Sequence, residues 1–329
     1  MHYSLRVLGL LASFIGGVAA AEPHGVPPAA LPSDVTGAFM LAPGQFAVRY
    51  AYEMTRYEQM RDGRDLVSAA QVLTRTGYQS APSRVDVERH DVSVWYAPVD
   101  RVTLIARLPV LEKSMLNQTR TGGFETRSSG VGDLDMTAVA RFMQHGDQQS
   151  FVSLGLGAPT GSIRARGDTP SGRERLPYPM QLGTGVWSLQ PVLSYRGEAE
   201  GLAWGGQATS RVYLGDNDLG YRPGNHYWLM GWVAGRWTDF LTTSLQTEWQ
   251  HWGNIKGRDR GLDVESTPVA DPMEQKGERL DMTLGVVVGR PKRSGPALEF
   301  EATLPLWERL DGPQPSFNWR FQVGLRWAL

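Results

Sequence analysis

The sequence of 329 residues contains no cysteine, and its formal net charge is only −1. Without cysteine the chain has no disulfide, no thiolate-bound zinc and no iron–sulfur cluster. A charge so close to neutral provides no basic surface, so we expect no nucleic-acid partner. The mean hydropathy of −0.31 resembles that of a soluble protein, but a transmembrane β-barrel also averages out as polar because its two faces cancel.

Long apolar runs are missing beyond the N-terminus. The longest charge-free stretch, residues 176–195, holds three prolines and two glycines, so it predicts a loop and a strand rather than a membrane helix. At the N-terminus, Arg6 precedes an apolar run that ends in three alanines before Glu22, which is typical of a cleaved secretory signal peptide. We therefore expect a signal peptide at 1–21 and a periplasmic leader at 22–43. With no cysteine after the cleavage site, a lipid anchor is excluded, and the leader is too short to be a plug domain.

Past residue 43 the hydrophobic pattern has a period of two, with turn residues between the repeats. We predict an all-β fold in which 44–329 forms one transmembrane antiparallel β-barrel of about twelve strands. Most of these strands have at least the ~9–11 residues that a tilted membrane strand requires. They are expected at 44–54, 84–97, 100–111, 130–143, 149–158, 184–196, 201–213, 226–238, 240–252, 279–290, 296–306 and 316–329.

The predicted connections alternate between short and long without a break. Turns such as PVD and GEAE follow every second strand, and several of the intervening connections exceed fifteen residues. Outer-membrane barrels have short periplasmic turns and long extracellular loops. The alternation therefore predicts a barrel in a Gram-negative outer membrane, surrounded by lipid and lipopolysaccharide, with both termini in the periplasm. A soluble β-sandwich has no reason to sort its loops in this way.

The two faces of each predicted strand differ in polarity. In 100–111, Leu104 and Leu108 share one face while Thr103 and Arg107 share the other. A charge that faces lipid at mid-membrane costs about 2–4 kcal/mol, so the charged faces must line the lumen. The charged lumen candidates are Arg107, Asp133, Asp135, Arg141, Arg196, Arg211, Glu248, Asp281, Glu299, Glu301, Arg320 and Arg326.

These charges permit two interpretations. Arg107 lies on the strand beside Asp133 and Asp135, and Glu299 and Glu301 adjoin the strand that carries Arg320. The charges either line a pore that selects solutes or pair into salt bridges that fill the barrel and fix its register. Barrels of eight strands are filled by side chains and those of sixteen leave a channel, so twelve strands leave both interpretations open.

The chain ends in FNWRFQVGLRWAL, where every second residue from Phe317 to Leu329 is apolar. We expect this apolar face to contact lipid. Trp319 and Trp327 are eight residues apart, roughly 26 Å along a strand, and two further residues of another strand, Trp187 and Tyr195, repeat the spacing. These pairs predict the two aromatic girdles of a membrane barrel. The final strand also resembles the signal read by the barrel assembly machinery, although that signal usually ends in an aromatic residue.

The strand at 226–238 is ambiguous. If Arg236 faces inward, then Trp228, Met230 and Trp232 line the lumen and could form an aromatic slide for flat solutes. If Arg236 instead extends to the periplasmic rim, the indoles face lipid. We favour the inward interpretation.

Three short motifs carry a family resemblance: GVGDLDMTAVARF at 130–142, GAPTGS at 157–162 and LPYPMQLGTGVW at 176–187. Together they resemble a Gram-negative outer-membrane family named for the meta-pathway of phenol degradation and often labelled only as transporters. The resemblance implies a β-barrel that lets small molecules through, with aromatic or other hydrophobic molecules as the expected class. It supplies no agreed catalytic residues.

An outer-membrane hydrolase is the rival class. Such an enzyme needs a nucleophile or an acid–base pair beside an oriented base. His226 and His251 are expected close together near the extracellular mouth, but the predicted strands place no serine beside them. We therefore assign no catalytic residue and expect an interfacial histidine pair.

The loop at 257–272 gathers four carboxylates. Oxygen ligands suit calcium, but the spacing is not that of an EF-hand, so we assign no metal and no cofactor. These carboxylates are Asp259, Asp263, Glu265 and Asp271. The sequence as a whole favours an outer-membrane channel or transporter for small molecules, passive or gated. A mouth-site hydrolase and a sealed structural or surface-interaction barrel remain the alternatives.

Overall fold

The computed structural model describes residues 32, 35, 40–289 and 295–328, so the predicted signal peptide at 1–21 lies outside the described residues. Eleven strands form the wall of one closed antiparallel barrel, because β1 pairs with β17 and closes the ring. The strands of the wall are β1 (Phe46–Gly63), β3 (Ser80–Val99), β4 (Val102–Thr119), β6 (Leu134–His145), β7 (Gln148–Ala158), β10 (Trp187–Ala199), β11 (Leu202–Leu214), β13 (His226–Arg236), β14 (Leu241–Trp252), β16 (Gly277–Gly289) and β17 (Pro296–Ala328).

The last strand crosses the wall twice. The first half of β17 pairs with β16, and its second half pairs with β1. The chain reverses near Gly312, whose φ of +79° lies in the left-handed region that glycine adopts without strain. Eleven elements, with β17 counted twice, therefore give the twelve crossings that the sequence predicts.

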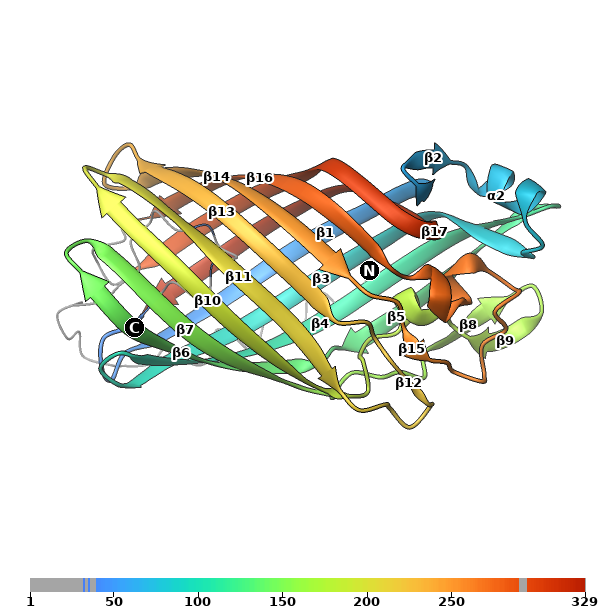
Figure 1. Cartoon of the computed structure of the whole chain (residues 1–329), viewed down its shortest axis with the longest axis horizontal. Coiled ribbons are helices and arrows are strands. Elements are labelled where there is room, and N and C mark those ends of the chain that lie inside the picture. The colour runs from blue at the N-terminus through green and yellow to red at the C-terminus, as the bar shows by residue number, and fades with distance from the viewer. Residues whose placement is uncertain (1–31, 33–34, 36–39, 290–294, 329) are drawn as a thin grey trace.

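The two ends of the barrel differ, as Figure 1 shows. Short turns at one end join β3 to β4, β6 to β7, β10 to β11 and β13 to β14; we call it the short-turn end. The other, long-loop end carries β2 (Asp65–Val67), α2 (Ala69–Arg75), β5 (Gly123–Val131), β8 (Arg166–Thr169), β9 (Gly172–Arg175), η3 (Tyr178–Met180), β12 (Tyr221–Arg222), β15 (Lys256–Gly257), η4 (Pro268–Ala270) and η5 (Pro272–Glu274). None of the helices in the described ranges is long and apolar enough to cross a membrane.

Several strands run past the predicted limits at the long-loop end. β1, β3 and β4 all extend beyond the predicted spans, and β4 continues into a hairpin with β5, paired from Gln118↔Gly123 to Val110↔Val131. The connection expected between 100–111 and 130–143 is therefore mostly strand. The two-faced pattern fades once a strand leaves lipid, but its backbone hydrogen bonds continue, which explains why the polarity pattern missed these extensions.

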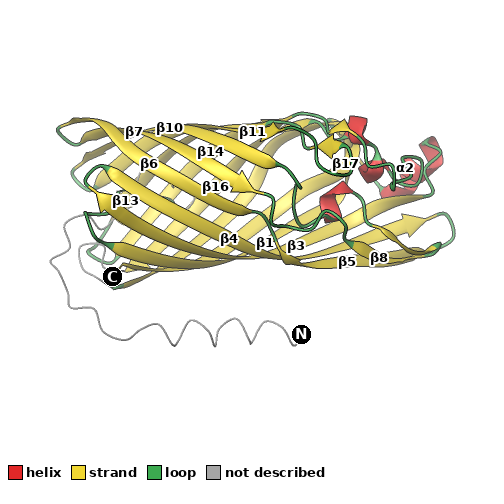
Figure 2. Cartoon of the chain, turned by 90° about the horizontal axis from the view of Figure 1, so that it is seen from below, coloured by secondary structure: helices red, strands yellow, loops and turns green. Residues whose placement is uncertain are grey.

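Side chains alternate between the lumen and the outer surface. On β4, Thr103 is fully buried inside the barrel, whereas Leu104 is 43% exposed on the outside. Large apolar side chains are exposed in the same way on the outer face of every strand of the wall. Figure 2 shows the closed wall from a second direction. A closed barrel that exposes apolar side chains all round its outside is suited to lipid, because it has no unpaired strand edge and presents apolar groups to the acyl chains.

The end of the final strand contains one departure from strict alternation. Phe317 is 4% exposed and lies inside the barrel, because the pairing with β1 shifts between Arg56↔Trp319 and Tyr57↔Phe317. Two residues of β17 oppose one residue of β1 at this bulge, which reverses the side on which the following side chains lie. The prediction that Phe317 shares the lipid-facing side with Trp319 is therefore wrong.

Candidate functional site

The lumen is filled by apolar side chains at the short-turn end. This lower core comprises Val35, Leu41, Ala47, Trp95, Ala97, Ile105, Val139, Phe151, Ala203, Met230, Trp232 and Ala234. Two of its members, Val35 and Leu41, belong to the predicted leader, and the Leu41 N–H donates to the buried Thr103 Oγ1 at 3.0 Å. The leader thus contributes to the packing inside the barrel, which the sequence did not predict. The apolar residues of the leader were the only feature of the sequence that could have indicated this packing.

The indoles of β13 point inward. Trp232 is 5% exposed within the lower core, and the Arg236 guanidinium donates to Glu198 at 3.2 Å. Glu198 also accepts from Arg196 at 2.7 Å. Trp228 stacks on His226, with ring centroids 3.8 Å apart. Trp232 therefore packs in a dense core rather than lining an open slide.

Ion pairs join β1 to β17 on the lumen side of the wall, beside the lower core. Glu299 is 2% exposed and lies between two arginines, with Arg49 Nε at 2.8 Å and Arg326 Nη2 at 3.2 Å. The neighbouring polar contacts are Gln322 to Glu301 at 3.4 Å and Arg320 to Thr303 at 3.4 Å. Arg141 lies at the rim, 3.9 Å from the exposed Asp100. Salt bridges thus fill much of the predicted charged lumen.

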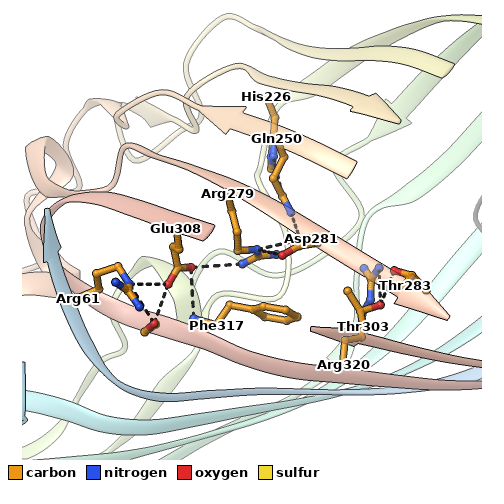
Figure 3. A network of polar contacts seen from close by, with 11 residues as sticks. Arg61, His226, Gln250, Arg279, Asp281, Thr283, Thr303, Glu308, Phe317 and Arg320 are labelled. Carbon is orange, nitrogen blue, oxygen red and sulfur yellow. Dashed lines mark hydrogen bonds and ion pairs between the residues drawn. The ribbon is translucent and has the colours of Figure 1, made fainter. Parts of the chain in front are cut away.

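A second polar network runs across four neighbouring strands of the wall, β13, β14, β16 and β17, as Figure 3 shows. His226 Nε2 contacts Gln250 Oε1 at 3.2 Å, and the Gln250 amide donates to Asp281 at 2.7 Å. Arg279 donates to Asp281 at 2.8 Å and reaches Glu308 at 3.6 Å. Glu248 pairs in register with Asp281 across β14 and β16. This network fixes the register of four strands.

Between these layers and the long-loop end lies a cavity of about 670 Å³, a volume typical of small-molecule sites. Its wall combines apolar and aromatic residues, Leu111, Tyr213 and Trp252 among them, with polar and charged residues. The charged lining residues are five cations, Arg89, Arg107, Lys113, Arg211 and Arg279, and four carboxylates, Glu53, Asp133, Asp135 and Glu308. We call this space the chamber.

In the chamber wall, Arg107 and Arg211 both contact Asp135, and the sequence had predicted all three as lumen residues. Asp135 accepts from Arg107 Nη2 at 3.0 Å and from Arg211 Nη2 at 3.0 and 3.1 Å. Asp133 has a different role. Its carboxylate instead accepts from the backbone of Gly161 at 2.9 Å and from the backbone and hydroxyl of Thr184 at 2.8 and 2.6 Å. Asp133 therefore fastens a loop, whereas Asp135 joins two guanidinium groups.

The loops at 159–186 and 253–276, which we call the mouth loops, cover the chamber. Leu176, Met180 and Val269 of these loops pack on Val85 and Met115 of the wall. Lys113 Nζ donates to the carbonyl of Pro179 at 2.9 Å, from inside the barrel. The chamber is thus capped by apolar packing at both ends.

The two mouth loops are joined to each other. Arg175 of the first loop donates to the buried Asp259 of the second at 2.6 Å, and the Asp259 N–H donates to the Tyr178 hydroxyl at 3.1 Å. Tyr178 packs edge-on against Tyr221 at 4.9 Å. Burial raises the pKa of Tyr178 and raises the pKa of Tyr221 to about 12. Both tyrosines therefore remain neutral at physiological pH.

The two histidines near the mouth do not form a pair. His226 pairs in register with Trp252, and His251 with Tyr227, so the two rings lie on opposite faces of the wall. His226 lines the chamber, whereas His251 lines a separate outer recess. The expected interfacial pair is therefore wrong. His226 hydrogen-bonds to Gln250, and within the described residues no serine or carboxylate hydrogen-bonds to it.

The carboxylates of the loop at 257–272 serve local structure. Asp259 pairs with Arg175, Asp263 accepts from the Glu265 N–H at 3.0 Å, and Asp271 accepts from the Met273 N–H at 2.8 Å. Across the described ranges, no group of three or more histidine, aspartate or glutamate side chains could hold a metal ion. The structure gives these carboxylates a role in fastening the loop.

All four predicted girdle residues lie on the outer face. Trp187, Tyr195 and Trp327 are 47%, 37% and 37% exposed. Trp319 is half-buried because the Arg56 guanidinium lies 5.3 Å from its ring. An arginine over an indole is suited to a lipid–water interface, where the ring meets the acyl chains and the cation meets the headgroups.

Comparisons with solved structures agree with this architecture. An outer membrane channel from Pseudomonas putida F1 matches with a TM-score of 0.64 and 15% identity, over 91% of this chain and 99% of that chain. The β domain of the Bordetella autotransporter BrkA has a TM-score of 0.44 at 11% identity, over 87% of this chain and 100% of that chain. A Pseudomonas aeruginosa FadL homologue has a TM-score of 0.43 at 11% identity, over 91% of this chain and 95% of that chain. No protein-family model matches the sequence, and no curated protein does. The match to the Pseudomonas putida F1 channel shows that the chain has the fold of an outer-membrane β-barrel.

Proposed function

We propose that the protein lets small molecules through the outer membrane by way of the chamber, and that passage is gated rather than open. The observation that carries this proposal is the cavity of about 670 Å³ inside the barrel, which lies between the lower core and the mouth loops. A porin needs a continuous aqueous path, whereas a capped chamber holds one solute at a time.

Exported location and transport of an aromatic or hydrophobic solute belong to this proposal. They are supported by the signal-like N-terminus, by the three motifs that resemble the phenol meta-pathway family, and by the apolar and aromatic residues of the chamber wall. The barrel needs no chemistry for this task, so we propose that it is not an enzyme. The contact of His226 with Gln250 rather than with a carboxylate favours this choice over a hydrolase.

The test is the single-channel conductance of the refolded mature chain in a planar bilayer. We expect brief or small openings from the wild type, and larger openings from Trp232→Ala because this substitution removes a buried indole from the lower core. Trp249→Ala is the matched control, since Trp249 is exposed on the outer face. If neither the wild type nor the Trp232→Ala variant conducts while both are folded, the barrel is sealed and the proposal fails.

A further inference from the structure

The outer face of the barrel is hollowed at the long-loop end. This outer recess has a volume of about 550 Å³ and lies beside the start of β13 and the end of β14. Because alternate side chains of these strands face opposite ways, the recess is open to the membrane side of the wall and not to the lumen. Its lining includes Asn225, Tyr227, His251, Asn254, Lys256 and Met273.

The recess lies at the expected level of the upper lipid–water interface. Tyr227 is nine residues from Arg236, where β13 ends at the short-turn end of the barrel. Nine residues span about 30 Å of strand, or roughly 21–25 Å of membrane depth once the strand is tilted. The apolar band of an outer-membrane barrel is about 25 Å tall. The recess therefore begins where acyl chains give way to headgroups.

The side of the recess nearer the membrane is continuous with the lipid-facing surface. Tyr227 is 42% exposed, and its ring centroid lies 6.4 Å from that of His251. Trp249, 38% exposed, lies 6.1 Å from the same imidazole. Met273 of the second mouth loop adds a flexible apolar side chain that is 66% exposed. Amphipathic rings are typical of this level of a membrane barrel, and the apolar surface between them suits an acyl chain.

The polar groups of the recess are mainly hydrogen-bond donors. Lys256 is exposed, and its ammonium makes no hydrogen bond or ion pair within the described part of the chain. Asn254 Oδ1 accepts from two backbone N–H groups of its own mouth loop at 3.0 and 2.7 Å, and Asn225 Oδ1 accepts from the Tyr213 N–H at 3.3 Å. These bonds occupy the oxygens of the two amides, so their NH₂ groups remain as donors.

The charge of the recess has one sign. The described residues that line it include Lys256 and no carboxylate. Two carboxylates on neighbouring elements are already ion-paired. Glu278 on β16 lies 3.6 Å from Arg309, and Asp216 beside β12 pairs with Arg222. One unpaired cation among amide donors favours an anion that is rich in acceptor oxygens, as a phosphate group is.

From this arrangement we infer that the outer recess binds lipid A, the phosphorylated glycolipid that anchors lipopolysaccharide. A phosphate lies at Lys256 and the asparagine amides, and an acyl chain lies against Tyr227 and Met273. Long loops mark the extracellular end of an outer-membrane barrel, where lipopolysaccharide forms the outer leaflet. The inference does not rest on the proposed transport, because the recess lies outside the lumen.

The experiment is native mass spectrometry of the refolded mature protein in detergent, titrated with three lipids. Lipid A carries sugars, acyl chains and phosphate, its dephosphorylated form lacks only the phosphate, and phosphatidylglycerol carries a phosphate without the sugars. We expect lipid A to bind at least about fivefold more tightly than the dephosphorylated form, since one lysine near an anionic lipid contributes about that factor. Phosphatidylglycerol should also bind less tightly, because it offers fewer acceptors to the amides.

Two variants test the residue assignment. Lys256→Gln should weaken lipid A binding about fivefold and leave the dephosphorylated form unchanged, because it removes only the charge. Tyr227→Ala should weaken the binding of both forms. Lys276→Gln is the matched control, because Lys276 is an exposed lysine at the same end that pairs with Asp311 outside the recess lining. Heat-modifiable gel mobility establishes that each variant is folded.

Equal affinity for lipid A and its dephosphorylated form, or undiminished lipid A binding by folded Lys256→Gln, would overturn the phosphate assignment. Phosphatidylglycerol binding as tight as lipid A would overturn the glycolipid assignment. Undiminished binding by folded Tyr227→Ala would overturn the placement of the acyl chain. Channel conductance plays no part in these measurements, so this site and the proposed transport can fail independently.

Discussion

At the scale of single residues, the buried charges explain how twelve strands can surround a filled interior. Glu299 illustrates the arrangement, since it is 2% exposed and contacts both Arg49 and Arg326. Taking charges out of water is costly, and the cost is recovered only where every partner is in place. Each such group fixes the relative position of the strands that carry it.

The first prediction concerns this carboxylate. Glu299→Gln leaves two buried guanidinium groups without their anion, so we expect the barrel to lose about 3–5 kcal/mol of stability. The measurement is equilibrium unfolding by urea in lipid vesicles. Asp100→Asn is the matched control, because the Asp100 side chain is 70% exposed at the rim and such pairs contribute about 1 kcal/mol or less. Similar losses for the two variants would contradict the assigned burial.

At the scale of elements, the second half of β17 is decided by one bulge. The bulge turns Phe317 into the lumen, where its ring lies 3.8 Å from the Arg279 guanidinium and 5.8 Å from the Tyr57 ring. Phe321, four residues on, is 42% exposed on the outer face. Phenylalanine therefore lies in a polar interior at position 317 and on the lipid-facing surface at position 321.

The second prediction follows from that difference. We expect Phe317→Ala to cost about 3–5 kcal/mol, the usual loss for emptying a buried aromatic site. Phe321→Ala should cost clearly less, because lipid fills the space that the outer side chain vacates. Unfolding of both variants in the same vesicles compares them directly. A larger loss for Phe321→Ala would mean that the strand lacks the bulge.

Tyr221, which packs against Tyr178 of a mouth loop, makes the stability of the protein depend on pH in the alkaline range. Burial raises the pKa of Tyr221 from its usual value of 10.0 to about 12. Between these values the folded state holds a proton that the unfolded state has lost, so the stability contributed by neutral Tyr221 is complete below pH 10 and falls as the pH rises toward about 12.

The third prediction is that Tyr221→Phe removes this dependence. Its unfolding midpoint should fall less than that of the wild type between pH 10 and about 12, with the other tyrosines contributing equally to both proteins. The two proteins are compared by thermal unfolding at a series of pH values. Parallel curves would show that Tyr221 is not buried beneath the mouth loops.

At the scale of the whole molecule, the chamber exists because both ends of the barrel are capped. The lower core closes the short-turn end with side chains from the wall and the leader. The mouth loops close the other end, and the ion pair between Arg175 and Asp259 joins them. Twelve crossings give a lumen that packing can close at its ends without filling its middle.

The fourth prediction tests this second cap. Asp259→Asn removes the charge that pairs with Arg175 but keeps the amide oxygen for the loop backbone. We expect more frequent channel openings with little change in overall stability, because the mouth loops lie outside the wall. Single-channel recording provides the measurement, and Asp263→Asn in the same loop is the control, since Asp263 accepts only a local backbone hydrogen bond. Unchanged opening frequency would exclude a gating role for the ion pair.

The sequence by itself determined the barrel, the twelve crossings, the order of short and long connections and the inward position of most charges. These features follow from alternation along each strand, a local property set by the requirement that charges avoid lipid. It also placed Arg107 near Asp135, because neighbouring strands of a hairpin-connected barrel pair in order.

Only the tertiary structure decided which charges meet and where space remains. Asp133 fastens a loop, Phe317 turns inward at a bulge, and His226 and His251 lie on opposite faces of the wall. The meeting of Arg211 with Asp135 joins β11 to β6, strands that are not neighbours in the wall. Contacts across the lumen and single-residue register shifts depend on how the closed barrel packs as a whole. The alternation of polar and apolar residues along one strand therefore cannot predict them.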